Sequence, residues 1–430
     1  AVRGWIPSSR AQPVIGDTNL TREDCVSSTT PETGALRTPG LVAVSVVAAL
    51  FVAGVLLLSG YDPPSADIKY DWLATREALR VGGDAHGDLL QLAAQEGVAV
   101  QINAPIGAER ITGHPRTPGA LLLLAPVAFV PYDVLFALAA GVTALSVAAM
   151  VGLTLRRRSR TLIGYFALLL LLTPAAMAIR FAGQAGLVAV LALSGWAMAS
   201  RRDSVWAGVL IGLAATLKLF PLILVVPLYL AAKKLSGHGA LATFVLLNLA
   251  GLFLPGITFA RAMDELMLAT GTWLELVANG SVVRQLVGFG LSTTAAAVIA
   301  IGVAVAVGFV YRRRFQTQPF FWLILSLLVL PLSWVSYDIV LYPVVLQMLH
   351  SSDDRLRLLG WLSVGLWLIP VAAYPFAVVS IGAFGLAVRL LLLGALLWKA
   401  DEFSDGATSK PLHSTSPSLA SATRVYGGSG

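Results

Sequence analysis

The chain has 430 residues, of which 57% are hydrophobic and only 12% are charged, and its mean hydropathy is +0.79. A soluble protein of this length needs far more polar surface, so the composition excludes that class and indicates a polytopic membrane protein. The net charge of +7 does not indicate a nucleic-acid partner, because much of it lies in short Arg and Lys clusters between apolar runs. The single cysteine, Cys25, provides neither a disulfide within the chain nor a cysteine-based metal site.

Two polar tails flank one long, mostly apolar region. Residues 1–40 are rich in Ser, Thr, Pro and Arg, and residues 401–430 in Ser, Thr and Gly, so we expect both to be disordered cytoplasmic tails. The region between them, 41–400, is expected to be an all-α transmembrane domain. We predict a first membrane span at 41–60, followed by an outer loop over 61–117, the longest polar interval of this region.

Within this loop, residues 65–81 carry apolar side chains at roughly helical spacing with charges between them. This pattern predicts an amphipathic helix lying on the membrane surface. Asp67 and Asp71 are four residues apart and therefore share one face of that helix. A carboxylate at the entrance of a membrane cavity can take a proton from a hydroxyl group. The alternative is a solvated helix whose carboxylates pair with its own Lys and Arg side chains.

The apolar run from Pro118 to Pro131 is too short to cross a membrane. Its dozen or so residues reach roughly 20 Å as a helix, against a hydrocarbon core of about 30 Å, so we interpret it as a re-entrant or interfacial segment. Including the first span, about twelve crossings are expected. The others are predicted at 133–155, 161–179, 185–200, 204–217, 219–232, 239–258, 291–311, 319–334, 339–349, 358–376 and 380–398.

Short basic clusters predict the topology, because Lys and Arg in short loops favour the cytoplasmic side. They all lie on one side of the membrane if residues 118–131 do not cross it. The clusters are Arg156–Arg160, Arg201–Arg202, Lys233–Lys234, Arg312–Arg314, and Arg355 with Arg357. Both termini are then inside, and the loops 61–117 and 259–290 face outside, together with Lys218 and the turns at 180–184 and 333–338.

Charged groups inside or beside membrane spans are costly, so each is a candidate functional residue. Lys218 lies between apolar runs, where its ammonium either binds an anion such as phosphate or extends to the membrane interface. Three arginines near predicted outer turns can either clamp a phosphate or hydroxyl group or anchor the chain at the interface; they are Arg116, Arg180 and Arg284. Arg389 lies inside the last predicted span and has no partner that the sequence reveals.

Other polar and aromatic side chains occur at the predicted outer turns. Gln184 and Gln285 each follow an arginine, and Trp334, Tyr337 and Asp338 share one turn. Aromatic rings beside a carboxylate suit a carbohydrate, although an aromatic belt at the membrane interface explains the Trp and Tyr without a ligand and is the default interpretation. The sequence has no Walker A, Rossmann, HExxH or DxD-like motif, and its histidines lack metal-ligand spacing, so we predict neither a nucleotide site nor a metal site.

Several stretches, taken in order, carry a family resemblance. The most specific is the central one, Ala207 to Leu222. The others are Asp67 to Tyr70 with Gly82-Gly83-Asp84, Pro115 to Leu122, Gly183-Gln184, Ser281 to Gly288 and Pro331 to Trp334. In these stretches the chain resembles glycosyltransferase family 87, a family of GT-C integral membrane enzymes. The resemblance covers residues 60 to about 345, which is nearly all of the membrane domain.

The resemblance implies a GT-C fold and an inverting transfer of mannose or arabinofuranose from a polyprenyl-phosphate donor. The acceptor would be a cell-envelope glycolipid or glycan on the outer face of a bacterial plasma membrane. Asp67 matches the family's expected catalytic base and Lys218 its central lysine, the first candidate for the donor phosphate. The further phosphate candidates are Arg180, Arg284 and Arg116, and the substrate-binding candidates are Asp71, Gln184, Gln285, Trp334, Tyr337 and Asp338. Membrane lipids, this donor and the acceptor are the expected partners, and the sequence identifies no further cofactor.

The chain departs from the family where donor and acceptor would be held. His114 to Pro118 stands where members often have Tyr-Pro-Pro or Thr-Pro, Ala185 follows Gly-Gln where many have Asn, and Val335 follows Ser-Trp where many soon have His. These differences argue against copying one member's specificity and leave an inactive family member as an alternative. A transporter or lipid flippase is the other alternative, but such proteins tend to have repeats with matching broken spans, and this sequence shows none.

Overall fold

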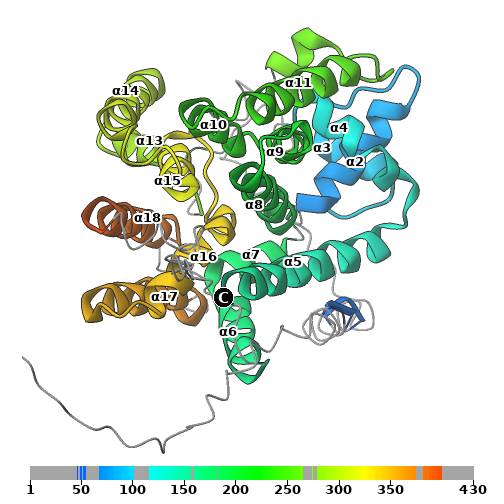
Figure 1. Ribbon diagram of the computed structural model, residues 1–430. Helices are drawn as coiled ribbons and strands as arrows, with labels where there is room; N and C mark the ends of the chain where they lie inside the picture. Colours follow the sequence, from blue (N-terminus) through cyan, green and yellow to red (C-terminus); the bar gives the residue numbers. More distant parts are fainter. Residues whose placement is uncertain are drawn as a thin grey trace, which may run out of the picture. The chain divides into compact units, whose positions relative to one another are not determined.

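The computed structural model describes residues 67–100, 116–155, 159–181, 183–264, 278–373 and 381–399, with residue 274 and a few positions between 46 and 54. Figure 1 shows these residues as helices joined by short connections. The predicted tails, 1–40 and 401–430, lie outside the described residues, as do most of the predicted first span and parts of both outer loops.

Within the described residues the chain is helical, apart from an isolated antiparallel bridge between Asn279 and Trp334, which confirms the predicted all-α class. The first helices are α2 (Asp67–Leu79), α3 (Leu89–Gln95), α4 (Pro118–Leu123), η1 (Ala125–Phe129), α5 (Tyr132–Leu155), α6 (Ser159–Leu171), α7 (Thr173–Arg180), α8 (Ala185–Arg201) and α9 (Val205–Leu217). They are followed by η2 (Phe220–Leu224), α10 (Val225–Leu230), α11 (Lys234–Gly251), α13 (Val282–Gly288), α14 (Thr293–Tyr311), α15 (Pro319–Val329), η3 (Val335–Leu341), α16 (Tyr342–Leu349), α17 (Asp354–Ala373) and α18 (Ile381–Trp398).

In the described part of the chain, three helices are long and apolar enough to cross a membrane: Tyr132–Gly152 of α5, all of α14 and all of α18. Helices α6 and α7 meet the same criterion only together, and they are bent by 66°. Pro174 sits in the first turn of α7, where proline is tolerated because its missing N–H has no helical partner. The segment predicted as one span at 161–179 is therefore a bent helix pair, which fits either a broken span or a re-entrant loop, and the count of about twelve crossings stays a prediction.

The span predicted at 239–258 has different limits, because α11 begins at Lys234 and ends at Gly251. Its early start follows from a cap that Asp203 supplies from the connection between α8 and α9. The carboxylate of Asp203 accepts hydrogen bonds from the backbone N–H groups of Leu235 and Ser236, at 3.0 and 2.9 Å. These are first-turn donors that have no acceptor within the helix, so the cap extends α11 into a polar stretch that apolar periodicity alone does not mark.

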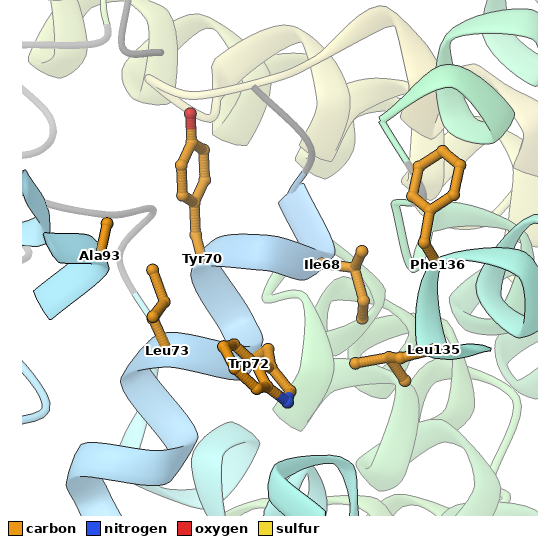
Figure 2. Close-up of a cluster of buried hydrophobic side chains, with 7 residues drawn as sticks. All are labelled: Ile68, Tyr70, Trp72, Leu73, Ala93, Leu135 and Phe136. Carbon is orange, nitrogen blue, oxygen red and sulfur yellow. The ribbon is translucent and has the colours of Figure 1, made fainter. Parts of the chain in front are cut away.

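Helix α2 forms where the amphipathic helix was predicted, but protein covers it, so the solvated alternative is wrong, and its position at the membrane surface stays a prediction. Most of its residues are buried, including the polar Lys69, Asp71 and Thr75. Figure 2 shows its apolar side chains Ile68, Tyr70, Trp72 and Leu73 clustered with Ala93 of α3 and Leu135 and Phe136 of α5. The helix also contacts α4 and η1. Its polar face therefore meets protein, and its charges need partners from other elements.

The segment 118–131, predicted not to cross the membrane, is made of two short helices, α4 and η1, and its non-crossing topology stays a prediction. Helix α4 lies against α11 with unusually close backbones. A Cβ atom placed on Gly251 would be 2.2 Å from the carbonyl oxygen of Pro118, and one on Gly119 would be 2.8 Å from the backbone nitrogen of Asn248. Only glycine fits at either position, and this contact places the start of α4 beside the end of α9.

Candidate active site

The carboxylate of Asp71 is the centre of a buried polar cluster. Asp71 is 1% exposed, and its Oδ1 accepts a hydrogen bond from Nε of Arg116. Its Oδ2 accepts one from Nε2 of Gln184 at 2.5 Å. Both partners come from other parts of the chain, so the alternative of carboxylates paired within their own helix is wrong for Asp71. A buried carboxylate is stable only when it is paired and hydrogen-bonded in this way.

Arg116 is held in place by the residue that follows it. Thr117 caps α4, since its hydroxyl oxygen accepts a hydrogen bond from the backbone N–H of Ala120 at 3.2 Å. The same hydroxyl donates to the carbonyl oxygen of Thr216 at 3.1 Å. Thr216 is the penultimate residue of α9, two positions before Lys218. The start of α4 and the end of α9 are therefore joined, which brings Arg116 and Lys218 to the same place.

Lys218 lies in the break between α9 and η2, where the backbone becomes extended (φ −147°, ψ 127°). It is 7% exposed, its Nζ lies 5.3 Å from the centre of the Tyr337 ring, and it makes no hydrogen bond or ion pair with any described residue. Burial, and then repulsion from Arg116, lower the pKa of Lys218 to about 8, against the attraction of Asp67 and Asp71. The ammonium therefore lies inside the protein, and the interpretation that it extends to the interface is wrong.

Asp67 opens α2 beside the turn that follows α7. Its backbone N–H donates to the carbonyl oxygen of Phe181 at 2.8 Å, and a Cβ atom placed on Gly183 would lie 3.5 Å from its Oδ2. The amino end of α2 favours a negative charge at this position. Asp67 acts electrostatically on both Arg116 and Lys218. We call the five residues Asp67, Asp71, Arg116, Gln184 and Lys218 the Asp71 cluster.

Two buried polar atoms of the Asp71 cluster have no hydrogen-bond partner among the described residues. They are Nη2 of Arg116, a donor, and Oε1 of Gln184, an acceptor, and each residue is 8% exposed. An unpaired buried group costs about 1–3 kcal/mol, so such atoms are rare unless water or a ligand pairs with them. The cluster therefore presents a donor and an acceptor on either side of one carboxylate, a pattern that suits a bound polar molecule.

The charges of the cluster are two carboxylates and two cations, of which Asp71 and Arg116 are directly paired. Lys218 is the cation that has no ion pair within the described ranges. Those ranges also contain no group of three or more His, Cys, Asp or Glu side chains that could hold a metal ion. The side chains of the cluster can supply proton transfer by a carboxylate and stabilisation of an anion by an ammonium.

The turn predicted at 333–338 is buried, so the aromatic-belt interpretation is wrong for its two rings. Trp334 and Tyr337 are 8% and 7% exposed. Tyr337 stacks on Phe220, with ring centres 5.3 Å apart, and Nζ of Lys218 lies 5.3 Å from the centre of the Tyr337 ring. Asp338 is fully buried, and its Oδ1 lies 2.6 Å from Nε of Arg389. Asp338 is thus the partner of Arg389 that the sequence analysis did not identify. The pairing could have been suspected, because each residue is an isolated charge of opposite sign within an apolar segment.

The remaining candidates lie on two helices. Arg180 is exposed at the end of α7, next to Phe181, whose carbonyl oxygen accepts the hydrogen bond from Asp67. Arg284 and Gln285 lie on α13, which packs against α14 and α15. The structure therefore brings Arg180 to the edge of the Asp71 cluster, whereas Arg284 and Gln285 belong to a different set of helices.

Comparison with known proteins gives one match. The family model described as Glycosyltransferase family 87 matches residues 117–335, just over half of the chain. The matched segment includes Gln184 and Lys218, while Asp67 and Asp71 precede it. No curated protein and no solved structure matches the chain.

Proposed function

Because the chain belongs to glycosyltransferase family 87, we propose that it transfers a sugar from a polyprenyl-phosphate donor to a glycolipid or glycan of the cell envelope. Family membership makes the protein a glycosyltransferase, and its long apolar helices make it a membrane protein. Our proposal adds the donor class, mannose or arabinofuranose as the sugar, and a site on the outer face of a bacterial plasma membrane. The Asp71 cluster is the observation that carries it, since it combines carboxylates with a buried cation that lacks an ion pair among the described residues.

In the proposed reaction Asp67 is the general base. It takes the proton of an acceptor hydroxyl, whose oxygen then forms a bond to the anomeric carbon of the donor sugar. The bond between that carbon and the phosphate oxygen breaks, and the polyprenyl phosphate leaves with the electron pair. Because attack and departure occur on opposite faces of the sugar, the anomeric configuration inverts. The ammonium of Lys218 stabilises the negative charge that develops on the phosphate.

In this proposal Asp71 positions other groups. Both of its oxygens already accept hydrogen bonds, from Arg116 and from Gln184. Nη2 of Arg116 and Oε1 of Gln184 then face the substrate as one donor and one acceptor, and sugar hydroxyls both donate and accept. Since Asp71 offsets the charge of Arg116, we assign Arg116 to a sugar hydroxyl and leave the phosphate to Lys218.

The other candidates take secondary places in the proposal. Arg180 adjoins the amino end of α2 and is a second candidate for the lipid phosphate. Arg284 and Gln285 remain candidates for the acceptor, on α13. Trp334 and Tyr337 are buried, and Tyr337 forms part of the wall beside Lys218. Asp338 pairs with Arg389, so we assign it to the scaffold and no longer to the substrate.

The test is a transfer assay with the purified full-length chain in lipid, supplied with polyprenyl-phosphate mannose or arabinofuranose and an envelope glycolipid. We expect Asp67→Asn to lower turnover about 10²- to 10⁴-fold, the usual contribution of a general base, without changing donor binding. Asp133→Asn is the matched control, because Asp133 is an exposed carboxylate in the first turn of α5. Full transfer by Asp67→Asn would refute the base, and movement of intact donor without transfer would favour a flippase.

A further inference from the structure

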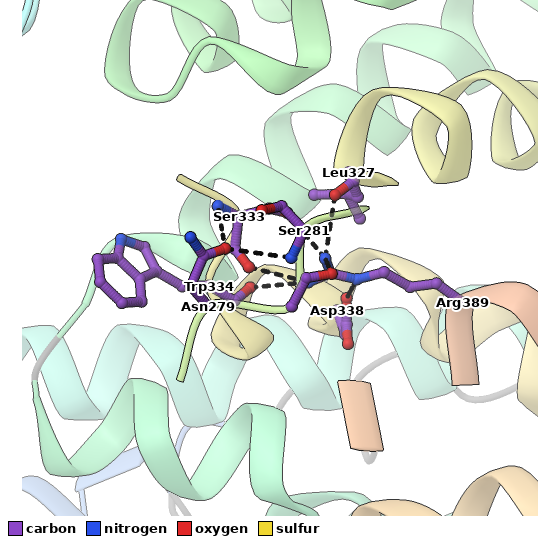
Figure 3. Close-up of polar contacts among 8 residues, drawn as sticks. Asn279, Ser281, Leu327, Ser333, Trp334, Asp338 and Arg389 are labelled. Atoms are coloured by element: carbon purple, nitrogen blue, oxygen red, sulfur yellow. Dashed lines mark hydrogen bonds and ion pairs between the residues drawn. The ribbon is translucent and has the colours of Figure 1, made fainter. Parts of the chain in front are cut away.

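Arg389 is a fully buried charge in the middle of α18, and each of its three side-chain nitrogens has at least one acceptor. Figure 3 shows how the guanidinium reaches several segments of the chain at once. The acceptors are Oδ1 of Asp338 at 2.6 Å, Oγ of Ser333 at 2.9 Å, and the carbonyl oxygens of Gly280 at 2.8 Å, Leu327 at 3.0 Å and Trp334 at 3.1 Å. One side chain therefore holds α15, η3 and the turn before α13 against α18.

Asn279 ties the same segments together a second time. Its Oδ1 accepts hydrogen bonds from the backbone N–H groups of Ser281 and Ser333, both at 3.1 Å, and its Nδ2 donates to the carbonyl oxygen of Pro331 at 2.6 Å. The backbone N–H of Gly280 donates to the carbonyl oxygen of Ser333 at 2.9 Å. We call this set the Arg389 network: Asn279, Gly280, Ser281, Leu327, Ser333, Trp334, Asp338 and Arg389.

The Arg389 network leads directly to Lys218 through Tyr337. Tyr337 lies between Trp334 and Asp338, both of which accept hydrogen bonds from Arg389. Its ring stacks on Phe220 at an interplanar angle of 22° and lies 5.3 Å from Nζ of Lys218. The position of η3 therefore decides whether this ring covers the ammonium.

The packing of α18 supports the same role. Gly385, one turn before Arg389, leaves room for η3, because a Cβ atom there would lie 2.5 Å from Cγ2 of Val335. A charge within an apolar helix is costly, and an apolar replacement of a buried ion pair often does no harm to stability alone. The arrangement of Arg389 is therefore best explained by the position that it imposes on η3.

We propose that Arg389 is a positioning residue for the donor-phosphate site, which it serves by holding Tyr337 over Lys218. The assignment of Lys218 to the phosphate rests on the proposed function, whereas the role of Arg389 in positioning Tyr337 does not. Three other charged groups also act on Lys218, namely Arg116, Asp67 and Asp71, and all three lie outside the Arg389 network. A change at Arg389 thus reaches Lys218 through η3, whereas the charges of the Asp71 cluster stay as they are.

The experiment measures how fast acetic anhydride modifies Lys218 in the full-length protein as the pH rises, read by mass spectrometry of the peptide. The wild-type midpoint should lie near pH 8. In Arg389→Gln we expect the midpoint to move towards about 10.4, the value of an exposed lysine, because water reaches the ammonium once the ring has moved. Binding of a polyprenyl phosphate should weaken about tenfold in the same variant.

Three variants separate positioning from general damage. Leu392→Ala removes a fully buried side chain from α18 outside the Arg389 network, so it should lower stability and leave the midpoint unchanged. Tyr337→Ala should reproduce the shift, and combining it with Arg389→Gln should add nothing further. If Arg389→Gln does not fold, Ser333→Ala decides instead, since it removes one acceptor and should shift the midpoint in the same direction by less.

A folded Arg389→Gln protein with the wild-type midpoint would overturn the proposal. If Arg389→Gln does not fold, a wild-type midpoint in Ser333→Ala would overturn it instead. Acetylation needs no sugar donor, so its result stands apart from the transfer assay. If the wild-type protein transfers no sugar but Arg389→Gln shifts the midpoint as expected, the proposed function is refuted and the positioning role stands. If the wild-type protein transfers sugar but Arg389→Gln leaves the midpoint unchanged, the positioning role is refuted and the proposed function stands.

Discussion

Two buried carboxylate–guanidinium pairs in this protein have the same chemistry and different surroundings. In the Arg389 network, Nε, Nη1 and Nη2 of Arg389 all have acceptors, and among the described residues Oδ2 of Asp338 has no hydrogen-bond donor. In the Asp71 cluster, Arg116 donates through Nε and leaves Nη2 unpaired within the described chain, and Gln184 leaves Oε1 unpaired. A buried pair with its donors satisfied is a scaffold, and one that leaves a donor and an acceptor open is suited to a ligand.

The strongest test of this contrast compares the two arginines. Arg389→Leu should lower the free energy of unfolding by about 3–5 kcal/mol, because it leaves the fully buried Asp338 without its counter-charge. Arg116→Leu should cost less, since Asp71 keeps the hydrogen bond from Gln184 and the attraction of Lys218. Thermal unfolding of both variants in one detergent measures the difference. Equal losses, or a larger loss for Arg116→Leu, would show that the contrast between the two pairs is mistaken.

The next effect concerns the cation of the Asp71 cluster. Lys218→Ala should weaken binding of the polyprenyl-phosphate sugar about 10- to 150-fold, because a charge-assisted hydrogen bond contributes about 1.5–3 kcal/mol. Acceptor binding should be unchanged. Lys234→Ala serves as the control, since Lys234 is an exposed lysine at the start of α11. Unchanged donor affinity in Lys218→Ala would remove Lys218 from the phosphate site.

A pH titration sharpens the same point. The pKa of Lys218 is lowered from 10.5 to about 8, so the ammonium is present below pH 8 and is lost as the pH rises through that value. Donor affinity of the free protein should therefore be flat below pH 8 and about tenfold weaker one unit above it. Lys218→Arg should abolish this dependence, because arginine stays charged throughout. A wild-type affinity that does not change up to pH 10 would contradict the role of Lys218.

The smallest expected effect tests the open acceptor in the Asp71 cluster. Gln184→Met nearly keeps the volume of the side chain and removes both Oε1 and the Nε2 donor to Asp71. The lost donor should lower stability, and the lost Oε1 should raise KM for one substrate about two- to tenfold, with little change in kcat. Gln347→Met is the comparison, because Gln347 of α16 also has a buried Oε1 without a hydrogen-bond partner among the described residues and lies outside the cluster. If Gln184→Met has wild-type KM values for both substrates, Oε1 of Gln184 does not accept a hydrogen bond from either substrate.

What the sequence determined by itself was local. The apolar runs and their basic flanks predicted a helical membrane protein, and the central signature from Ala207 to Leu222 placed it in its family. Asp67 and Lys218 were both identified from that resemblance, and the structure brings them into one cluster. Helical periodicity and signature motifs depend on neighbours within a few residues, so they are visible in the sequence.

Only the tertiary structure decided which polar groups contact one another. Asp71 accepts hydrogen bonds from Arg116 and Gln184, which are 45 and 113 residues away in the sequence, and Arg389 pairs with Asp338, which is 51 residues away. Burial of α2, and of the turn that carries Tyr337, came from the same packing. These contacts depend on how helices lie against one another, as at Gly119 and Gly251, and no local pattern in the sequence encodes that geometry.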